Sequence, residues 1–223
     1  MNLLQGFQII PNFYEPSEVR QIISLIYNKD SSNFRKSKDL FAIRQVLQEI
    51  PELKALLFNA KLNSLISSFG EEYTCIKSIY FDKPPHSNWT VPWHQDLFIG
   101  VREKIEIAGF RQWTNKDGFC NVQPPLEILE NIVTVRIHLD NCDENNGALK
   151  VIPRSHLHGV VDLPYQSYQD EVICSVPEGG VCLMKPLILH ASLKSKSDDH
   201  RRVVHLEFCS KSLPDGLRWT EVW

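Results

Sequence analysis

The chain has 223 residues, of which 43% are hydrophobic and 23% charged, and its formal net charge is −3. This composition is typical of a globular protein, and the length suits one domain with a sizeable core. The charges are interspersed and no apolar run is long enough to span a bilayer, so we expect no nucleic acid and no membrane among its partners. We therefore expect a single domain over residues 1–223; its oligomeric state cannot be read from the sequence.

Six cysteines are scattered along the chain without a C-x-x-C pair. The N-terminal residues lack a basic segment followed by an apolar one, so we expect no secretion signal. Both features favour reduced, mostly buried thiols over a disulfide framework, and the spacing disfavours a zinc site made of cysteines. The expected location is therefore cytoplasmic.

The N-terminal third, residues 1–72, is predicted to be helical. A first helix opens at Glu15-Pro16-Ser17-Glu18, where proline and acidic residues suit a first turn, and it continues with one apolar stripe. Asp39 is expected to cap a second helix, which carries Ile43, Val46, Leu47 and Ile50. Pro51 is expected to start a third helix that ends near Gly70. These apolar faces would pack on a sheet and have no catalytic role.

From Tyr73 onward the pattern changes to short β-branched and aromatic segments separated by turn clusters. The predicted strands are Tyr73–Phe81, Val91–Val101, Ile132–Leu139, Ala148–Ile152, Val172–Val176, Val181–His190 and Arg202–Cys209. Many short strands without alternating helices indicate an antiparallel sandwich or jelly roll. We therefore expect a mainly β core over residues 73–210, with the N-terminal helices packed on one sheet.

The connection from Gly100 to Asn131 is long, aromatic and mixed in charge. Long ordered connections in compact domains are often lids or binding loops, but a surface excursion packed by its own aromatic residues is an equal alternative. If the segment binds substrate, Arg111 beside Trp113 would suit an anionic, partly apolar molecule.

The stretch Val91–Leu97 carries the strongest chemical signal. In an extended strand side chains alternate between two faces, so His94 and Asp96 point the same way and can reach one metal ion. A second histidine would complete the facial triad of two histidines and one carboxylate, which leaves open positions on ferrous iron. An H-x-D pair alone is a weak signal, because hydrogen-bonded or solvated pairs with this spacing are common.

Candidates for the third ligand and for a co-substrate site lie downstream. His190 ends the predicted apolar strand, although a lone histidine there is more often a core residue bonded to a backbone carbonyl. Ser192 follows it, and Arg201 begins the next strand, although an arginine taken by itself is more often a surface residue. A guanidinium binds a carboxylate through two parallel hydrogen bonds, and a hydroxyl adds a further donor, which is what a dicarboxylate co-substrate requires. The order H-x-D, histidine, arginine is more specific than any of its members.

Three motifs in this order resemble the phytanoyl-CoA dioxygenase family of iron(II)- and 2-oxoglutarate-dependent oxygenases. They are Trp93-His94-Gln95-Asp96, the run from Asn146 to His156, and His190-x-Ser192 followed by Arg201. The resemblance covers about residues 73–210 and is weaker in the N-terminal helices. It implies a double-stranded β-helix, which is a cupin-like jelly roll, with a metal held by His94, Asp96 and His190.

The resemblance also implies Fe(II), 2-oxoglutarate and O2 as cofactor and co-substrates, and Arg201 with Ser192 as the site of the distal carboxylate of 2-oxoglutarate. Arg136 stands where family members often place a tryptophan that contacts the co-substrate. It would bind the other carboxylate or an acidic substrate, if it points into the barrel with Thr134 and His138 and not outward. Lys77 is a further candidate for a carboxylate contact, or else a solvated lysine.

The reaction implied by the resemblance is hydroxylation of a C–H bond of a small organic molecule, with release of succinate and carbon dioxide. Asp96 disfavours halogenation, because related halogenating enzymes carry a small residue at the corresponding place. Catalysis would require no residue beyond the metal ligands. The alternative is a cupin-like metal-binding protein that is non-catalytic or non-oxidative; the Arg201 clamp argues against the first, and the lack of an H-x-H pair argues against the second.

Overall fold

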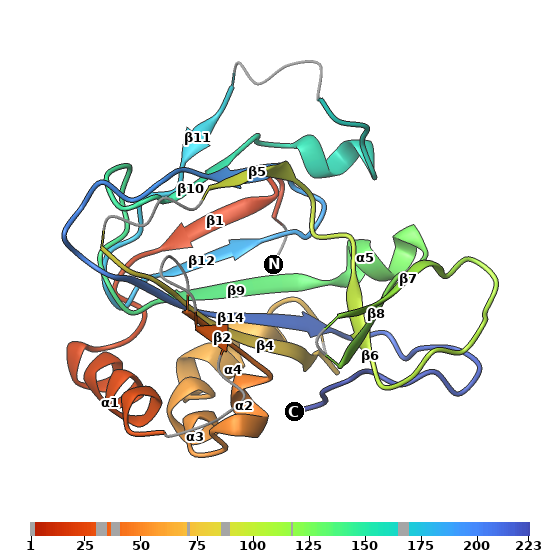
Figure 1. The fold of residues 1–223 in the computed structure, drawn as a ribbon, viewed down its shortest axis with the longest axis horizontal. Coiled ribbons are helices and arrows are strands. Elements are labelled where there is room, and N and C mark those ends of the chain that lie inside the picture. The colour runs from red at the N-terminus through yellow and green to blue at the C-terminus, as the bar shows by residue number, and fades with distance from the viewer. Residues whose placement is uncertain are drawn as a thin grey trace.

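The computed structural model describes residues 3–29, 35–36, 41–70, 72–85, 90–116, 118–164 and 170–223, which form three layers (Figure 1). N-terminal helices cover one face of a seven-stranded sheet, and a four-stranded sheet lies against its other face. The strands within each sheet pair antiparallel. This is the mainly β jelly roll with helices on one sheet that the sequence predicted. None of the helices in the described ranges is long and apolar enough to cross a membrane.

The large sheet has the strand order β1-β12-β9-β14-β4-β3-β2. Its strands are β1 (Phe7–Ile10), β2 (Arg35–Lys36), β3 (Phe41–Arg44), β4 (Thr74–Lys83), β9 (Val133–His138), β12 (Val181–Met184) and β14 (Arg201–Cys209). Along β9 and β14 the side chains alternate, so that Val135, Ile137, Val204 and Leu206 join the core beneath the helices. The opposite face of the same strands carries polar side chains and turns them toward the small sheet.

The small sheet has the order β11-β10-β13-β5. Its strands are β5 (Val91–His94), β10 (Leu149–Val151), β11 (Val172–Ile173) and β13 (His190–Ser192). Between β5 and β13 the register sets His94 opposite His190. Two histidines that are 96 positions apart in the chain therefore become direct neighbours across two paired strands.

Two of the predicted strands are each divided in the structure. The segment Val91–Val101 forms β5 and then β6 (Ile99–Val101), with Asp96 in the irregular stretch between them. The segment Val181–His190 forms β12 and then β13, because Lys185–Leu189 crosses from the large sheet to the small one. The assumption that His94 and Asp96 share one strand, and that His190 ends one, was therefore wrong in detail.

In its described residues, the N-terminal third contains four helices and three strands. The helices are α1 (Pro16–Tyr27), α2 (Val46–Glu49), α3 (Leu53–Leu57) and α4 (Ala60–Ser67). The first begins as predicted, where the Glu18 carboxylate accepts a hydrogen bond from the Glu15 N–H at 2.8 Å. The predicted second helix is mostly wrong, because Ile43 lies in β3, paired with β4; the expected cap, Asp39, lies outside the described residues.

The predicted third helix is divided at Asn59. Its side chain accepts a hydrogen bond from the Leu62 N–H at 3.0 Å and so caps a new helix, α4. The apolar faces of these helices pack on the large sheet as expected, and they bury Leu53, Leu57 and Leu62.

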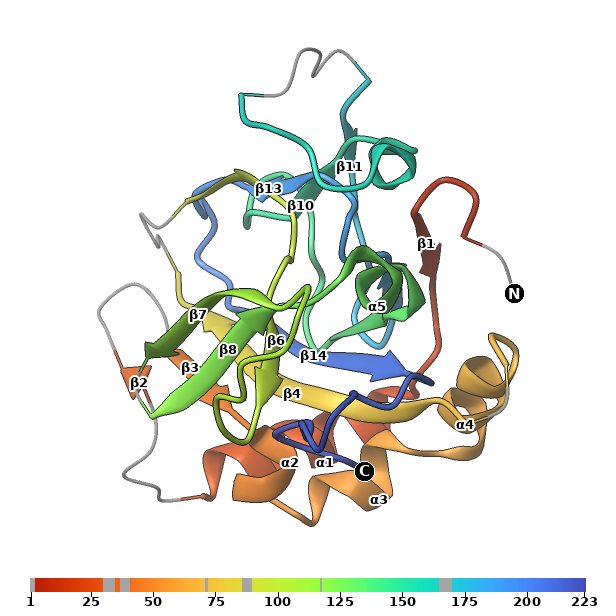
Figure 2. The ribbon, with the colours of Figure 1, turned by 90° about the vertical axis from the view of Figure 1, so that its right-hand side faces the viewer.

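The connection Gly100–Asn131 folds into secondary structure of its own. It contributes β7 (Arg111–Lys116), β8 (Phe119–Gln123) and α5 (Leu126–Asn131), and β8 lies between β6 and β7 in a separate sheet. Figure 2 shows this sheet standing beside one end of the two larger sheets. Its apolar side chains form a second core cluster with the C-terminal segment, including Phe110 and Trp219. The segment is thus a packed substructure, and its role in substrate binding stays a prediction.

Candidate active site

Two histidines and one aspartate meet at the β5 edge of the small sheet. The rings of His94 and His190 have centroids 4.1 Å apart. The Oδ1 of Asp96 lies 3.7 Å from Nε2 of His94, and its Oδ2 lies 3.6 Å from Nε2 of His190. One possible ligand atom from each residue lies within 4.8 Å of the other two, which suits a single divalent ion. The structure therefore brings together all three residues that the sequence proposed as ligands.

The other ring nitrogen of each histidine is tied to the backbone. Nδ1 of His94 lies 2.8 Å from the Pro92 carbonyl oxygen, and Nδ1 of His190 lies 2.9 Å from that of Ile188. A carbonyl can only accept, so each Nδ1 carries the proton and each Nε2 presents a lone pair to the centre of the triad. This is the tautomer that a metal ligand requires, and the backbone bond holds the ring in place.

The electrostatics of the triad favour the protonation states that bind a cation. Burial lowers the pKa of His190 to about 4, although the Asp96 carboxylate opposes this shift. Burial acts to raise the pKa of Asp96, but the neighbouring His190, His205, His94 and Lys77 more than offset it and hold the pKa at about 2. At neutral pH His190 is therefore neutral and Asp96 is ionised, as metal binding requires.

Gln95, between two of the triad residues, anchors the ligand segment and was missed in the sequence. Its Nε2 donates to the carbonyl oxygens of Leu187 at 2.6 Å and Gly159 at 2.8 Å, and its Oε1 accepts from the Val161 N–H at 3.0 Å. The next residue is held as well, because the Asp96 N–H donates to the Pro186 carbonyl at 2.9 Å. Only the position of Gln95 inside the H-x-D motif hinted at this role.

Replacing Gln95 by leucine is expected to weaken metal binding by about tenfold to 100-fold, because groups that hold ligands in place contribute this much. The side chain is nearly isosteric but makes none of the three hydrogen bonds. Titration of the apoprotein with Fe(II) under anaerobic conditions measures the effect. Asn121→Leu is a matched control, because the Asn121 amide donates to the nearby Phe119 carbonyl and lies outside the ligand segment. Unchanged metal affinity in Gln95→Leu would show that the anchor is dispensable.

Buried polar atoms without partners gather on the inner faces of the two sheets. In the part of the chain that the structure describes, they include Thr134 Oγ1, Arg136 Nε, His138 Nδ1, Ser192 Oγ, and Nε and Nη1 of Arg201. Unsatisfied buried groups cost free energy, so such a concentration indicates a polar ligand. Carboxylate groups fit this set of donors, because two guanidinium groups and hydroxyls are available to receive them. Arg201 and Ser192, both proposed from the sequence, belong to this group.

A chain of hydrogen bonds runs from Arg136 along the inner face of the large sheet. Nη1 of Arg136 lies 3.0 Å from Nδ1 of His205, whose Nε2 lies 3.1 Å from Oε1 of Glu207. A guanidinium only donates, so Nδ1 of His205 accepts and the proton sits on Nε2, which donates to Glu207. Glu207 also accepts from Lys77 Nζ at 2.8 Å, and Lys77 donates to the Phe98 carbonyl at 3.0 Å. The guanidinium of Arg136 is therefore held in place.

This chain of hydrogen bonds includes two of the residues that were predicted to contact the co-substrate. Arg136 is buried and points into the space between the sheets, as the shared face with Thr134 and His138 predicted. Lys77 is largely buried and not a solvated surface lysine, and its charge is already paired with Glu207. His205 and Glu207 were missed in the sequence, where the only signal is their alternation with apolar residues along the last strand.

The two residues proposed for substrate binding lie on β7. Arg111 is exposed at the first position of the strand, opposite Gln123 of β8. Trp113 packs against the second core cluster, with Lys104 Nζ 5.9 Å from the centre of its ring. Their role in binding substrate stays a prediction.

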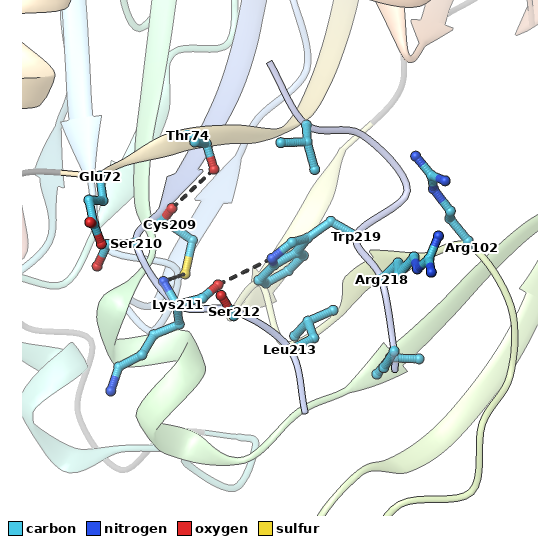
Figure 3. A pocket seen from close by; sticks show the side chains of 12 residues that line it. Glu72, Thr74, Arg102, Cys209, Ser210, Lys211, Ser212, Leu213, Arg218 and Trp219 are labelled. Atoms are coloured by element: carbon cyan, nitrogen blue, oxygen red, sulfur yellow. Dashed lines mark hydrogen bonds between the residues drawn. The ribbon is translucent and has the colours of Figure 1, made fainter. Parts of the chain in front are cut away.

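A hollow of about 460 Å³ lies at the C-terminal segment and includes none of the triad residues (Figure 3). Three exposed cations, Arg102, Lys211 and Arg218, line it. In its wall the Trp219 indole donates to the Lys211 carbonyl at 3.2 Å. We assign no ligand to this hollow.

The buried His138 makes the stability of the apoprotein depend on pH. Burial, together with the charges of Arg136 and Arg201, lowers the pKa of His138 well below its ordinary value. The unfolded chain takes up this proton below about pH 6.5, so the free energy of unfolding should decrease as the pH falls from about 6.5 toward 5. Urea unfolding of His138→Gln over this range should show a smaller decrease than the wild type. A residual decrease is expected, because the pKa of His190 is also lowered, and equal decreases in both proteins would contradict the assignment.

A jelly roll that holds two histidines and a carboxylate at one point defines the class of non-haem iron oxygenases. The family model described as phytanoyl-CoA dioxygenase matches residues 3–203. The chain belongs to this family, and it is a non-haem iron- and 2-oxoglutarate-dependent oxygenase. Its cofactor and co-substrates are therefore Fe(II), 2-oxoglutarate and O2. No curated protein gives a significant match to the sequence.

Solved structures with the same fold share little sequence with this chain. SnoK, described as a non-haem α-ketoglutarate-dependent carbocyclase from nogalamycin biosynthesis, has a TM-score of 0.70 at 16% identity, over 92% of this chain and 80% of its own. EvdO2 from Micromonospora carbonacea var. aurantiaca, complexed with 2-oxoglutarate, has a TM-score of 0.67 at 20% identity, over 95% and 90%. HygX from Streptomyces hygroscopicus, with nickel and 2-oxoglutarate bound, has a TM-score of 0.65 at 14% identity, over 92% and 83%. These similarities establish the fold.

Proposed function

We propose that the protein hydroxylates a C–H bond of a small organic molecule and releases succinate and carbon dioxide. The observation that carries the proposal is the convergence of His94, Asp96 and His190, together with unpaired buried donors of Arg201 and Ser192 in the same fold. When bound, iron(II) would activate O2 and couple the oxidative decarboxylation of 2-oxoglutarate to the oxidation of the substrate. Because Asp96 fills the carboxylate position of the triad, we propose hydroxylation and not halogenation.

In this proposal the protein binds the metal and 2-oxoglutarate, orients them, and excludes water from the site. His94, Asp96 and His190 hold the metal through two Nε2 atoms and a carboxylate oxygen, as their tautomers and charges allow. The guanidinium of Arg201 and the hydroxyl of Ser192 receive the distal carboxylate of 2-oxoglutarate. Both lie on the inner side of the jelly roll, where water is excluded and charge-assisted hydrogen bonds are strong.

We further propose that the substrate carries an acidic group that faces Arg136. Glu207 already balances Lys77, whereas Arg136 is bonded to a neutral imidazole and keeps an unpaired Nε. The charge of Arg136 also contributes to the lowered pKa of His190, which supports a position of the guanidinium near the proposed metal site. Arg111 and Trp113 are proposed to contact the same substrate from the separate sheet. A protein with Arg136→Gln should bind 2-oxoglutarate as the wild type does and should lose succinate release with acidic substrates. Weaker 2-oxoglutarate binding would instead assign Arg136 to the co-substrate.

An anaerobic titration tests the function directly. Fe(II) is added to the apoprotein, followed by 2-oxoglutarate, and chelation of the iron by the keto acid should produce a weak visible charge-transfer band. A screen of small carboxylic and phosphorylated acids should then find compounds that accelerate succinate release. Iron binding without a band would favour a non-oxidative or non-catalytic cupin-like protein, and failure to bind iron would contradict the triad.

A cytoplasmic location remains our prediction. It is supported by the six cysteines, all of which are free thiols and five of which are buried. Reduced thiols are the rule in the cytosol. Detection of the protein in a cell fractionation experiment would test the prediction.

A further inference from the structure

Gln123, the last residue of β8, carries a buried amide that belongs neither to the triad nor to the proposed clamp. Only 3% of its surface is exposed, and its Oε1 is buried without a hydrogen-bond partner in the part of the chain that the structure describes. A buried amide oxygen without a partner costs free energy, so folded proteins rarely keep one without a reason. A ligand that supplies the missing hydrogen bond would be such a reason.

The register of β8 places Gln123 beside the segment that carries the metal ligands. β8 pairs antiparallel with β6, and Val122 lies opposite Ile99. Beyond this pair β8 continues to Gln123, while the partner chain runs back from Ile99 toward Asp96. Asp96 precedes Ile99 by only three positions in the chain. The end of β8 that carries Gln123 is therefore the end nearest to Asp96.

The side chain of Gln123 lies on the face of the separate sheet that covers the inner face of β4. Side chains alternate along β8, so Phe119, Asn121 and Gln123 share one face. Val122 points to the other face, where it is buried in the second core cluster. Phe119 and Asn121 line a hollow together with Lys77 of β4. The face to which Gln123 belongs is therefore directed toward Lys77.

Lys77 connects this hollow with the metal site. Its Nζ donates to the carbonyl oxygen of Phe98, which follows Asp96 by two positions, and its charge contributes to the lowered pKa of Asp96. The face with Gln123 thus borders the space next to the triad. Arg111 is the direct partner of Gln123 in the pairing of β7 with β8. A residue that the sequence proposed for substrate binding therefore lies beside the unpaired amide.

We propose that the amide of Gln123 binds a hydroxyl group of the substrate and so selects a small acid that carries a hydroxyl group. The inference rests on the proposed function, because it takes the substrate to bind beside the triad with its acidic group at Arg136. An amide offers an acceptor oxygen and a donor nitrogen, and a hydroxyl group can pair with either of them. The amide carries no charge, so the group that it recognises is neutral. A site that is built to bind a hydroxyl group discriminates strongly against analogues that lack it.

Matched pairs of acids with and without hydroxyl groups test the proposal. The pairs are 3-hydroxybutyrate and butyrate, 4-hydroxyphenylacetate and phenylacetate, and quinate and cyclohexanecarboxylate. Each acid is added to the protein with Fe(II), 2-oxoglutarate and O2, and kcat/KM for succinate release is measured. We expect at least one hydroxylated acid to exceed its partner by about tenfold or more. This preference should fall about tenfold in Gln123→Met, which keeps the length of the side chain but removes both polar atoms.

The competing explanation is that Gln123 only stabilises the separate sheet. The loss of a polar atom that has no partner should not destabilise the fold, so Gln123→Met should melt no lower than the wild type. It should also bind Fe(II) and 2-oxoglutarate as the wild type does. Gln123→Glu keeps an acceptor oxygen at the same distance from the backbone and should recover part of the preference. Gln8→Met is the matched control, because Gln8 is exposed on the edge strand β1, and it should leave the preference unchanged.

Two results would overturn the proposal. One is an unchanged preference in a folded Gln123→Met protein, and a lowered melting temperature in that protein would then assign Gln123 to the stability of the sheet. The other is a wild-type protein for which no hydroxylated acid exceeds its partner. Absence of the charge-transfer band with 2-oxoglutarate in the wild type would instead contradict the proposed function itself.

Discussion

Alanine in place of His190 is expected to abolish iron-dependent release of succinate from 2-oxoglutarate while the domain stays folded. The substitution removes one of the two Nε2 atoms that face Asp96, so the affinity for Fe(II) should fall by at least about 100-fold, more than is lost with a residue that merely supports a ligand. The fold should persist because the backbone pairing of β13 with β5 and β10 does not depend on the imidazole. Metal titration, succinate formation and thermal unfolding measure the three effects.

His158→Ala is the control for this experiment. His158 ends the short 3-10 helix η1 (Ser155–His158), is exposed, and is not one of the three residues of the triad. Its removal should leave metal affinity and succinate formation unchanged. A His190→Ala protein that melts like the wild type and keeps full activity would remove His190 from the metal site.

Glutamine in place of Arg201 is expected to weaken 2-oxoglutarate binding by about 100-fold. The substitution removes a buried ion pair in which the guanidinium would donate two charge-assisted hydrogen bonds to the distal carboxylate. Nε and Nη1 of Arg201 are buried and have no partner among the described residues, so the guanidinium is already desolvated and gains strongly from a carboxylate. The preference for 2-oxoglutarate over 2-oxovalerate, which has a methyl group in place of the distal carboxylate, should shrink accordingly. Competition between the two keto acids for the Fe(II) protein measures this preference.

Arg202→Gln provides a control from the neighbouring position. Arg202 points to the other face of β14, where its Nη2 lies 2.5 Å from Asp140 Oδ1 and its guanidinium 5.8 Å from the ring centre of Tyr27. Its loss should lower the thermal stability and leave the preference between the keto acids intact. If both variants change that preference equally, the effect comes from disturbance of β14 and not from a carboxylate clamp.

Much of the site was predictable because most of its candidate residues lie in short sequence motifs. His94, Asp96, His190 and Arg201 were identified from residue type, spacing and a family resemblance, and the structure brings the first three within ligand distance of one another. The details of the strands were less predictable. The segment ending at His190 reads as one apolar strand, but its middle crosses between sheets, and an apolar run does not reveal which sheet it joins.

The N-terminal third, which was predicted to be helical, shows the same limit of prediction from apolar patterns. The apolar residues around Ile43 suit a helix and a strand about equally well, and β3 exists because the edge of β4 offers it a partner. In contrast, the amphipathic stripe of α1 and its acidic first turn are local properties of the chain, and this helix begins where the sequence predicted.

The sequence by itself indicated a mainly β fold through its periodicity. Through the resemblance of three short motifs, it also indicated the family and the proposed metal ligands. Only the tertiary structure decided which distant side chains share the space inside the jelly roll. Gln95 bonds to the segment around Gly159, His205 joins Arg136 to Glu207, and Lys83 is set beside Arg201. These contacts follow from strand register and from the crossing of the chain between sheets. They arise because buried polar and charged groups must find partners among whatever the fold brings near them, and no local pattern encodes that choice.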